Sequence, residues 1–149
     1  MYPFVLAVHN IIRWVVVIAG ILAIGQALVG WLVKKEWTKR DRMLGMIFTA
    51  SVDTQLLLGI LLYFVFSPIT KGAFNDFGAA MAIADQRFFA IEHVFYMVLA
   101  LVFAHLGSAL PKKVDDAQSK FKRAALWFGL ALLLILAGTP WGRPLFPGL

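Results

Sequence analysis

The chain has 149 residues, of which 61% are hydrophobic and 15% are charged, and its mean hydropathy is +0.82. Soluble domains are usually about 45–50% apolar, so this composition excludes an ordinary soluble domain and indicates an integral membrane protein. The sequence contains no cysteine, which excludes disulfides, thiolate-bound metals and covalently attached haem.

Four apolar segments are candidates for membrane-spanning helices. A hydrocarbon core about 30 Å thick requires roughly 20 apolar residues in helical conformation. Segments of this kind occupy residues 4–33, 43–68, 87–110 and 124–138. We therefore predict an all-α transmembrane bundle of four helices with up-down-up-down topology, forming a single domain over residues 1–149.

The positive charge of the chain is concentrated between the predicted spans. Five Lys or Arg residues lie in the segment 34–42 and five in the segment 111–123, out of fourteen in the whole chain. With four spans these two loops share one side, and the positive-inside rule makes that side cytoplasmic and places both termini on the other side. A basic rim facing anionic lipid headgroups explains the net charge of +6 without a nucleic-acid partner.

Two polar residues lie one helical turn apart in the first span. His9 and Arg13 are four residues apart and therefore share one helix face. A charged group near the bilayer centre costs on the order of 2.5–3.5 kcal/mol unless it has a partner. Asp53 in the second span lies at a similar depth, so we predict an Arg13–Asp53 ion pair. This pair would either hold two helices in register or, with Gln55, serve proton or quinone chemistry.

The connection over residues 69–86 is polar at first and apolar later. We predict an external loop with a short interfacial helix or lid. Asp85 is placed to act as the N-cap of the third span.

The third span carries charged residues and a histidine at its outer end and a second histidine near its cytoplasmic end. His93 and His105 are twelve residues apart, which is roughly 18 Å along a helix. Glu92 lies about 100° around the helix from His93, so we expect it to orient a neighbour such as His9 or to pair with Arg87. We read His105 as a helix–helix contact, with Gln26 as its partner.

His9 and His93 are predicted to lie at comparable depths, because the first and third spans run in the same direction. Two imidazoles at one depth on different helices meet the minimum requirement of a six-coordinate b-type haem, with His9 and His93 as metal ligands. Arg13 would then neutralise a haem propionate, or pair with Asp53 or Glu92. The alternative is that each histidine only forms a hydrogen bond between helices.

Glycines at positions 20, 25, 30 and 59 are consistent with either arrangement. They can admit a flat macrocycle between helices, and they serve close helix packing equally well.

Several motifs are spread over nearly the whole chain. They are His9-x-x-x-Arg13, the run Thr54-Gln55-Leu56-Leu57-Leu58-Gly59 with Leu62-Tyr63-Phe64, the segment Arg87-Phe88-x-x-Ile91-Glu92-His93, and the ending Pro140-Trp141-x-Arg143-Pro144. Together they resemble the small four-helix bacterial membrane proteins classed as cytochrome b-like. The resemblance implies electron transfer by haem in the inner (cytoplasmic) membrane of a bacterium. In that family a histidine usually precedes the Thr-Gln pair of the second helix, where this chain has Asp53, so we expect one haem rather than two.

The leading hypothesis is a membrane electron carrier with one haem b between the first and third spans, working beside a larger respiratory or photosynthetic complex and with or without a quinone. One alternative is a haem-free accessory subunit of a larger membrane complex or a homo-oligomer. Another is a polar site for quinone or protons. The residues considered for that site are Arg13, Asp53, Gln55, Arg87, Glu92 and His105. A carrier or accessory subunit is favoured over an enzyme, and no catalytic residue is assigned.

Overall fold

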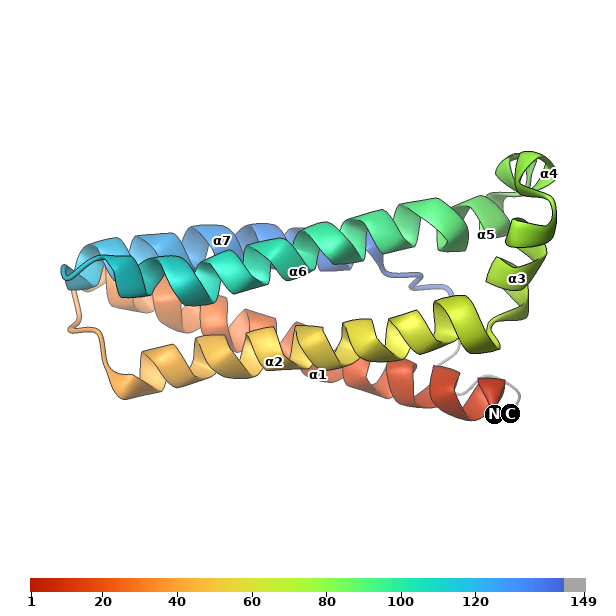
Figure 1. Cartoon of the computed structure of the whole chain (residues 1–149). Helices are drawn as coiled ribbons and strands as arrows, with labels where there is room; N and C mark the ends of the chain where they lie inside the picture. The colour runs from red at the N-terminus through yellow and green to blue at the C-terminus, as the bar shows by residue number, and fades with distance from the viewer. Residues whose placement is uncertain (144–149) are drawn as a thin grey trace.

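A computed structural model describes residues 1–143, which form helices joined by short connections and contain no strand (Figure 1). Four of the helical segments are long and apolar enough to cross a membrane. The first is α1 (Tyr2–Leu32), and the second is α2 (Lys39–Leu61) with the π-helical turn η1 (Leu62–Phe66) that continues it. The third consists of α5 (Ala84–Arg87), the π-helical turn η2 (Phe88–Glu92), α6 (His93–Ala109) and the 3-10 turn η3 (Leu110–Lys113). The fourth is α7 (Ala117–Gly138). The predicted all-α fold, with four helices long and apolar enough to cross a membrane, is confirmed for the described residues.

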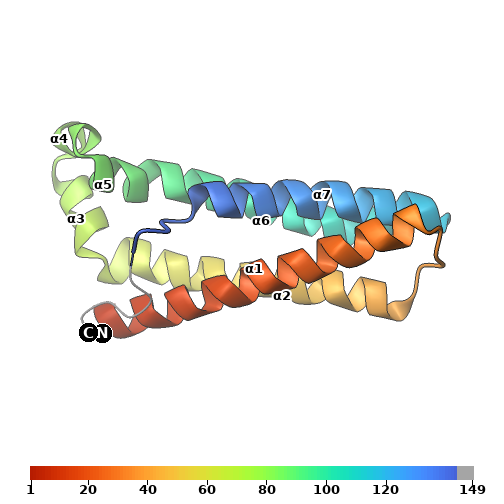
Figure 2. The ribbon, with the colours of Figure 1, turned by 180° about the vertical axis from the view of Figure 1, so that it is seen from behind.

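The four long segments alternate in direction, so both basic loops lie at one end of the bundle and the start of α1 lies at the other (Figure 1). Seen from behind, α1 runs diagonally from α2 at its own beginning toward α7 at the basic end (Figure 2). The last position of the motif that ends at Pro144, and the end of the predicted domain over 1–149, lie outside the described residues.

Two of the helices begin earlier than the apolar count predicts. The second begins at Lys39 instead of residue 43, and the fourth at Ala117 instead of residue 124. Each has a polar first turn that is stabilised by side-chain hydrogen bonds. The Asp41 carboxylate accepts from the backbone N–H of Thr38 at 2.8 Å, and the Asp116 carboxylate accepts from the backbone N–H of Ser119 at 2.7 Å. Such caps satisfy N–H groups that a helix start leaves free, so hydropathy alone places the start too late.

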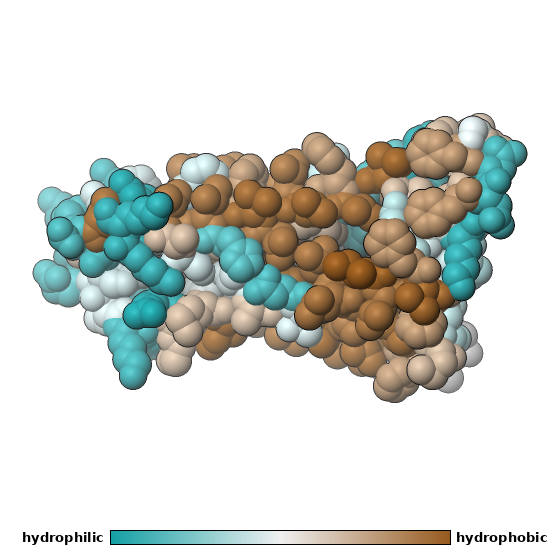
Figure 3. Space-filling view, in the orientation of Figure 1, coloured by the Kyte–Doolittle hydropathy of each residue, from teal (hydrophilic) through white to brown (hydrophobic). Residues whose placement is uncertain are grey.

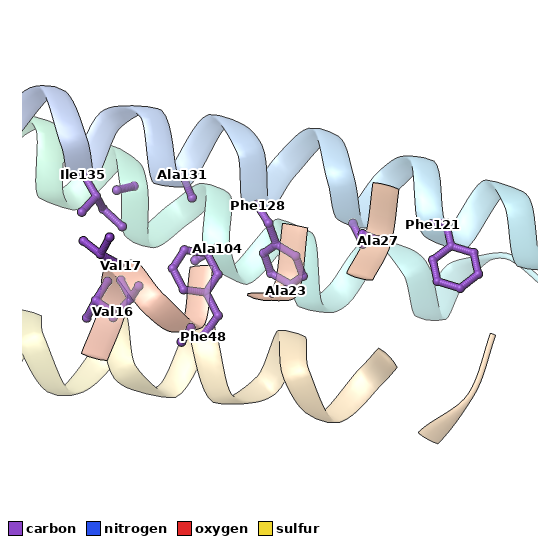
Figure 4. Close-up of a cluster of buried hydrophobic side chains, with 14 residues drawn as sticks. Val16, Val17, Ala23, Ala27, Phe48, Ala104, Phe121, Phe128, Ala131 and Ile135 are labelled. Carbon is purple, nitrogen blue, oxygen red and sulfur yellow. The ribbon is translucent and has the colours of Figure 1, made fainter. Parts of the chain in front are cut away.

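The main core lies where α1, α2, α6 and α7 pack together, in the half of the bundle nearer the basic loops (Figure 4). Phe48 and Phe121 are completely buried, and the rings of Phe48 and Phe128 meet edge to face at 5.5 Å. A Cβ atom on Gly20 would lie 2.9 Å from the Phe48 ring, and one on Gly30 would overlap the Phe121 ring. These two glycines therefore serve close helix packing.

The connection between the second and third spans is built from short helices. They are α3 (Pro68–Asn75), α4 (Phe77–Ala82) and α5. The predicted N-cap role of Asp85 is wrong, because α5 begins directly after Ile83 and Asp85 instead accepts a hydrogen bond from Arg143 at 2.7 Å. That contact joins residues 58 positions apart, which local sequence patterns do not reveal.

The two π-helical turns face each other across the end of the bundle. A π turn loosens the regular hydrogen-bond ladder and leaves carbonyls that need other donors. The Tyr63 hydroxyl of η1 donates to the Ala90 carbonyl of η2 at 2.7 Å, and the Thr70 hydroxyl donates to the Tyr63 carbonyl at 2.7 Å. These bonds tie α2, α3 and the start of α6 together just beside His93.

We predict that Gly30→Ala lowers the stability of the bundle, because its new methyl group must displace the buried Phe121 ring. Overpacking of this kind typically costs about 1–3 kcal/mol. The matched control is Gly25→Ala in the same helix, where a Cβ meets no atom within 4 Å. The thermal midpoint of the detergent-purified protein, followed by circular dichroism, should fall for Gly30→Ala and stay level or rise for Gly25→Ala. Equal midpoints would contradict this account of the core.

Candidate cofactor site

His9 on α1 and His93 at the start of α6 lie next to each other inside the bundle. Their ring centroids are 6.4 Å apart and their planes are inclined by 68°. The two residues are 84 positions apart in the sequence, and they meet because α1 and α6 run in the same direction. The prediction that they occupy comparable depths is confirmed.

Both histidines line a cavity of about 350 Å³ at the end of the bundle opposite the basic loops. Its walls come from α1, α2, η1, α3, α6 and the residues around the end of α7. The lining is mainly apolar, and its polar groups include His9, Arg13, Gln55, His93 and Arg143. Cavities of about 300–1,000 Å³ with apolar walls and a few placed polar groups are typical of small-molecule and cofactor sites.

The orientation of the His93 ring is fixed by the end of α7. Its Nδ1 atom lies 2.7 Å from the carbonyl oxygen of Gly138. A carbonyl can only accept, so Nδ1 carries the proton, and the neutral ring keeps its lone pair on Nε2. The rings of Phe88 and Phe89 lie against it, with centroid distances of 5.8 and 5.9 Å. This is how proteins usually orient a histidine whose other nitrogen binds a metal.

His9 is held through its backbone rather than its ring. The side-chain amide of Gln55 donates to the His9 carbonyl at 2.9 Å, which joins α1 to α2 at this level. A Cβ atom on Gly59 would lie 3.6 Å from Cε1 of His9, so the small residue leaves room for the ring beside α2. The buried Nδ1 of His9 and Oε1 of Gln55 have no hydrogen-bond partner among the described residues.

Arg13 lies one turn further into the bundle and is only 8% exposed. Its Nε atom has no hydrogen-bond partner in the described part of the chain. The guanidinium carbon lies 5.9 Å from the ring centroids of both Trp14 and Trp141. Aromatic faces attract a desolvated cation by about 2 kcal/mol, so the two indoles offset part of the cost of burying this charge.

The predicted Arg13–Asp53 ion pair is wrong. Asp53 instead lies 2.8 Å from Nε2 of His105, across the contact between α2 and α6. The prediction that His105 makes a helix–helix contact is confirmed, but its predicted partner Gln26 is wrong, because the Gln26 amide donates to Asp41 at 2.7 Å. Depth along a helix can be counted from the sequence, whereas the direction in which a side chain points depends on how the helices are rotated.

Of the two alternatives for Glu92, the ion pair is the one that forms. Its carboxylate accepts from Nε of Arg87 at 2.8 Å, and both side chains are more than 40% exposed. The structure therefore brings His9, His93, Arg13 and Gln55 to one cavity. It leaves the Arg87–Glu92 pair at the rim of the bundle and Asp53 with His105 on another face.

Arg143 also lines the cavity, a position that the sequence does not predict. Its guanidinium donates to Asp85 at 2.7 Å, and its carbon lies 4.5 Å from the centroid of the Phe89 ring. The available signal was its place in the Pro140-Trp141-x-Arg143 motif directly after an apolar helix. After α7 the chain turns back so that Arg143 lines the cavity.

The geometry of the two histidines is compatible with a haem. Imidazole nitrogens bind metals at about 2.0–2.1 Å, and the ring centre lies roughly 1 Å further out, so two imidazoles that hold one metal ion can have ring centroids up to roughly 6 Å apart. The observed 6.4 Å agrees with that separation. The described residues contain no group of three or more His, Cys, Asp or Glu side chains that could hold a metal ion. Two imidazoles in an apolar cavity suit iron that is already held in a macrocycle.

Comparison with family models, curated proteins and solved structures finds no match for this chain. The resemblance of its motifs to cytochrome b-like proteins therefore stays a prediction. Function is inferred from the geometry of the cavity.

We predict that Gln55→Met destabilises the protein, because it removes the hydrogen bond from α2 to the His9 carbonyl while keeping a side chain of similar length. Hydrogen bonds between membrane helices contribute about 0.6–2 kcal/mol. Thr54→Val is the control, since among the described residues the Thr54 hydroxyl bonds only to the Ala50 carbonyl of its own helix. Unfolding by sodium dodecyl sulfate in mixed micelles measures the difference, and a Gln55→Met curve that overlays that of Thr54→Val would refute the role given to this bond.

Proposed function

We propose that the protein is a membrane electron carrier of the b-type cytochrome kind, in which His9 on α1 and His93 on α6 would hold one haem. The observation that carries this proposal is the pair of imidazoles that line one mainly apolar cavity with their ring centroids 6.4 Å apart. The haem would supply reversible one-electron chemistry. The chain itself contributes ligand orientation, charge compensation and exclusion of water.

Ligand orientation comes from two elements outside the pair. The hydrogen bond from His93 to the Gly138 carbonyl holds the ring and directs its Nε2 lone pair away from α7. Such bonds also raise the basicity of a histidine ligand. The hydrogen bond from Gln55 to the His9 carbonyl holds α1 at the level where the His9 ring lies beside His93.

Charge compensation is the role that we assign to Arg13. Among the described residues no carboxylate lies within ion-pair distance of the Arg13 guanidinium. Asp53, Asp85 and Glu92 contact His105, Arg143 and Arg87 instead. A buried guanidinium without a carboxylate favours a ligand that brings its own anionic group. A haem propionate has this chemistry, and Arg143 lines the same cavity.

The apolar lining and the surrounding bilayer would keep water from the iron. The described connections between the spans contain only short helices and turns, so we infer that the electron donor and acceptor reach the haem within or at the edge of the membrane. We therefore place it in a bacterial inner membrane, with its basic loops on the cytoplasmic side, beside a larger respiratory or photosynthetic complex.

We predict a reduced-minus-oxidised absorbance spectrum typical of a low-spin haem for the protein purified after expression with ample haem supply. His9→Ala and His93→Ala should each abolish the Soret band and its shift on dithionite addition. His105→Ala is the matched control and should leave the band unchanged, because His105 contacts Asp53 outside the cavity. Protein without a Soret band would refute the proposal and favour the haem-free accessory subunit.

Quinone binding in the same cavity is a second candidate function. It is favoured by Nε of Arg13 and Oε1 of Gln55, which have no hydrogen-bond partner among the described residues. Nε–H of Arg13 can donate to a quinone carbonyl, and Oε1 of Gln55 can accept from the hydroxyl of the reduced form. Asp53, which the sequence included in this site, does not line the cavity.

We predict for this candidate that a soluble short-chain quinone quenches tryptophan fluorescence, since Trp14 and Trp141 both lie beside Arg13. Arg13→Gln should weaken the quenching several-fold by removing the donor. Asp53→Asn should not change it. If Asp53→Asn weakens binding as much as Arg13→Gln does, the cavity is not the quinone site.

A further inference from the structure

Asp53 and His105 form a polar pair on the outside of the bundle. Their side chains are 44% and 54% exposed, although both lie well inside segments that are long and apolar enough to cross a membrane. Arg13, by comparison, is almost completely buried. Ionisable residues within membrane spans almost always face the protein interior or a water-filled cavity, because exposure to lipid is costly.

The face that carries this pair is formed by α2 and α6, which are the two less buried spans. In the most apolar stretch of each of these spans 22% of the residues are buried, against 39% for α1 and 44% for α7. Figure 3 shows this face, where hydrophilic side chains interrupt the apolar surface near the middle of the bundle. The α2–α6 face therefore exposes more of its helices than the rest of the bundle does, and it carries its polar pair within the length of both spans.

We propose that a second copy of this chain covers the α2–α6 face. In the resulting homodimer, Asp53 of each protomer faces the partner's His105. The polar pairs are then enclosed between two bundles instead of facing lipid tails. This proposal does not depend on the identity of the ligand in the cavity.

The choice of a second copy rests on the self-complementary charge of the face. Asp53 and His105 are hydrogen-bonded and so lie at one depth in the membrane. A twofold axis along the membrane normal preserves depth and orientation, so it brings the acid of one protomer opposite the imidazole of the other. Closed twofold dimers of this isologous kind are the commonest oligomers. No group outside this chain is needed to pair the acid and the imidazole.

Exposed apolar side chains surround the pair on the same two helices. Leu57 is one turn from Asp53 and is 64% exposed, and Val102 is one turn from His105 and is 45% exposed. In the dimer these side chains would pack against their counterparts around the polar pairs. They give positions at which proximity can be measured without altering Asp53 or His105.

Because the chain contains no cysteine, a single introduced cysteine reports by cross-linking which face of the bundle meets a second copy. Leu57→Cys and Val102→Cys, each the only cysteine of the full-length protein, are reconstituted in lipid vesicles and treated with a short bismaleimide. Ile18→Cys on α1 and Leu133→Cys on α7 are the controls, being 55% and 65% exposed on other faces. We expect covalent dimers several-fold more abundant for the α2–α6 positions. Equal cross-linking at all four positions, or none, would overturn the proposal.

Treating native membranes with the same reagent tests the alternative of a different partner. A Leu57→Cys product with the mass of two copies supports the homodimer, whereas a product that joins this chain to another protein overturns the choice of a second copy.

A double variant tests the polar pair itself. Asp53→Leu with His105→Leu makes the face compatible with lipid, so we expect the dimer fraction in vesicles, counted by single-molecule photobleaching, to fall several-fold. The helix content and any haem spectrum should not change, because neither residue lines the cavity. An unchanged dimer fraction in a folded double variant would show that the pair does not drive association.

Discussion

Every polar group that enters the bilayer must find its partner inside the protein, and this constraint organises the bundle. The beginnings of α2 and α7 use the carboxylates of Asp41 and Asp116, and the loosened carbonyl of Ala90 accepts from Tyr63. Gln55 bonds to the backbone of α1. Where the described residues leave buried polar atoms without partners, these atoms gather around one cavity. The buried polar atoms without a hydrogen-bond partner therefore mark the cavity as the candidate site, because the other buried polar side-chain atoms of the described residues have partners.

The bundle divides into two halves with different packing. Near the basic loops, α1 packs closely on both α7 and α2, with Phe121 of α7 over Gly30 and Phe48 of α2 over Gly20. Toward the other end α1 diverges from α7 and leaves a lined cavity. The tight half fixes the helix positions, and the open half uses that rigidity to hold two imidazoles at a set distance. A bundle with large aromatic side chains at both ends would have no space for a ligand.

The sequence predicts well how far along its helix a residue lies, and it predicts poorly toward which neighbouring helix the side chain points. The four spans follow from apolar length, and the meeting of His9 and His93 follows from counting residues along two parallel helices. The same counting placed Arg13 and Asp53 together, yet Asp53 points toward His105, because a helix rotation that no local pattern encodes decides which face meets α1. The Arg143–Asp85 contact was missed since it joins distant segments after a helix end. Polar first turns of helices were missed because hydropathy ignores capping.

The π-helical turn η2 ends at Glu92, immediately before His93. Such a turn amounts to one extra residue inserted into an α-helix, and it shifts the phase of all that follows by about 100°. Arg87 and the face of α6 that carries His93 toward the cavity thus belong to different helical phases. Deleting one residue from this turn would therefore rotate His93 by about 100° relative to Arg87 and turn it away from the cavity.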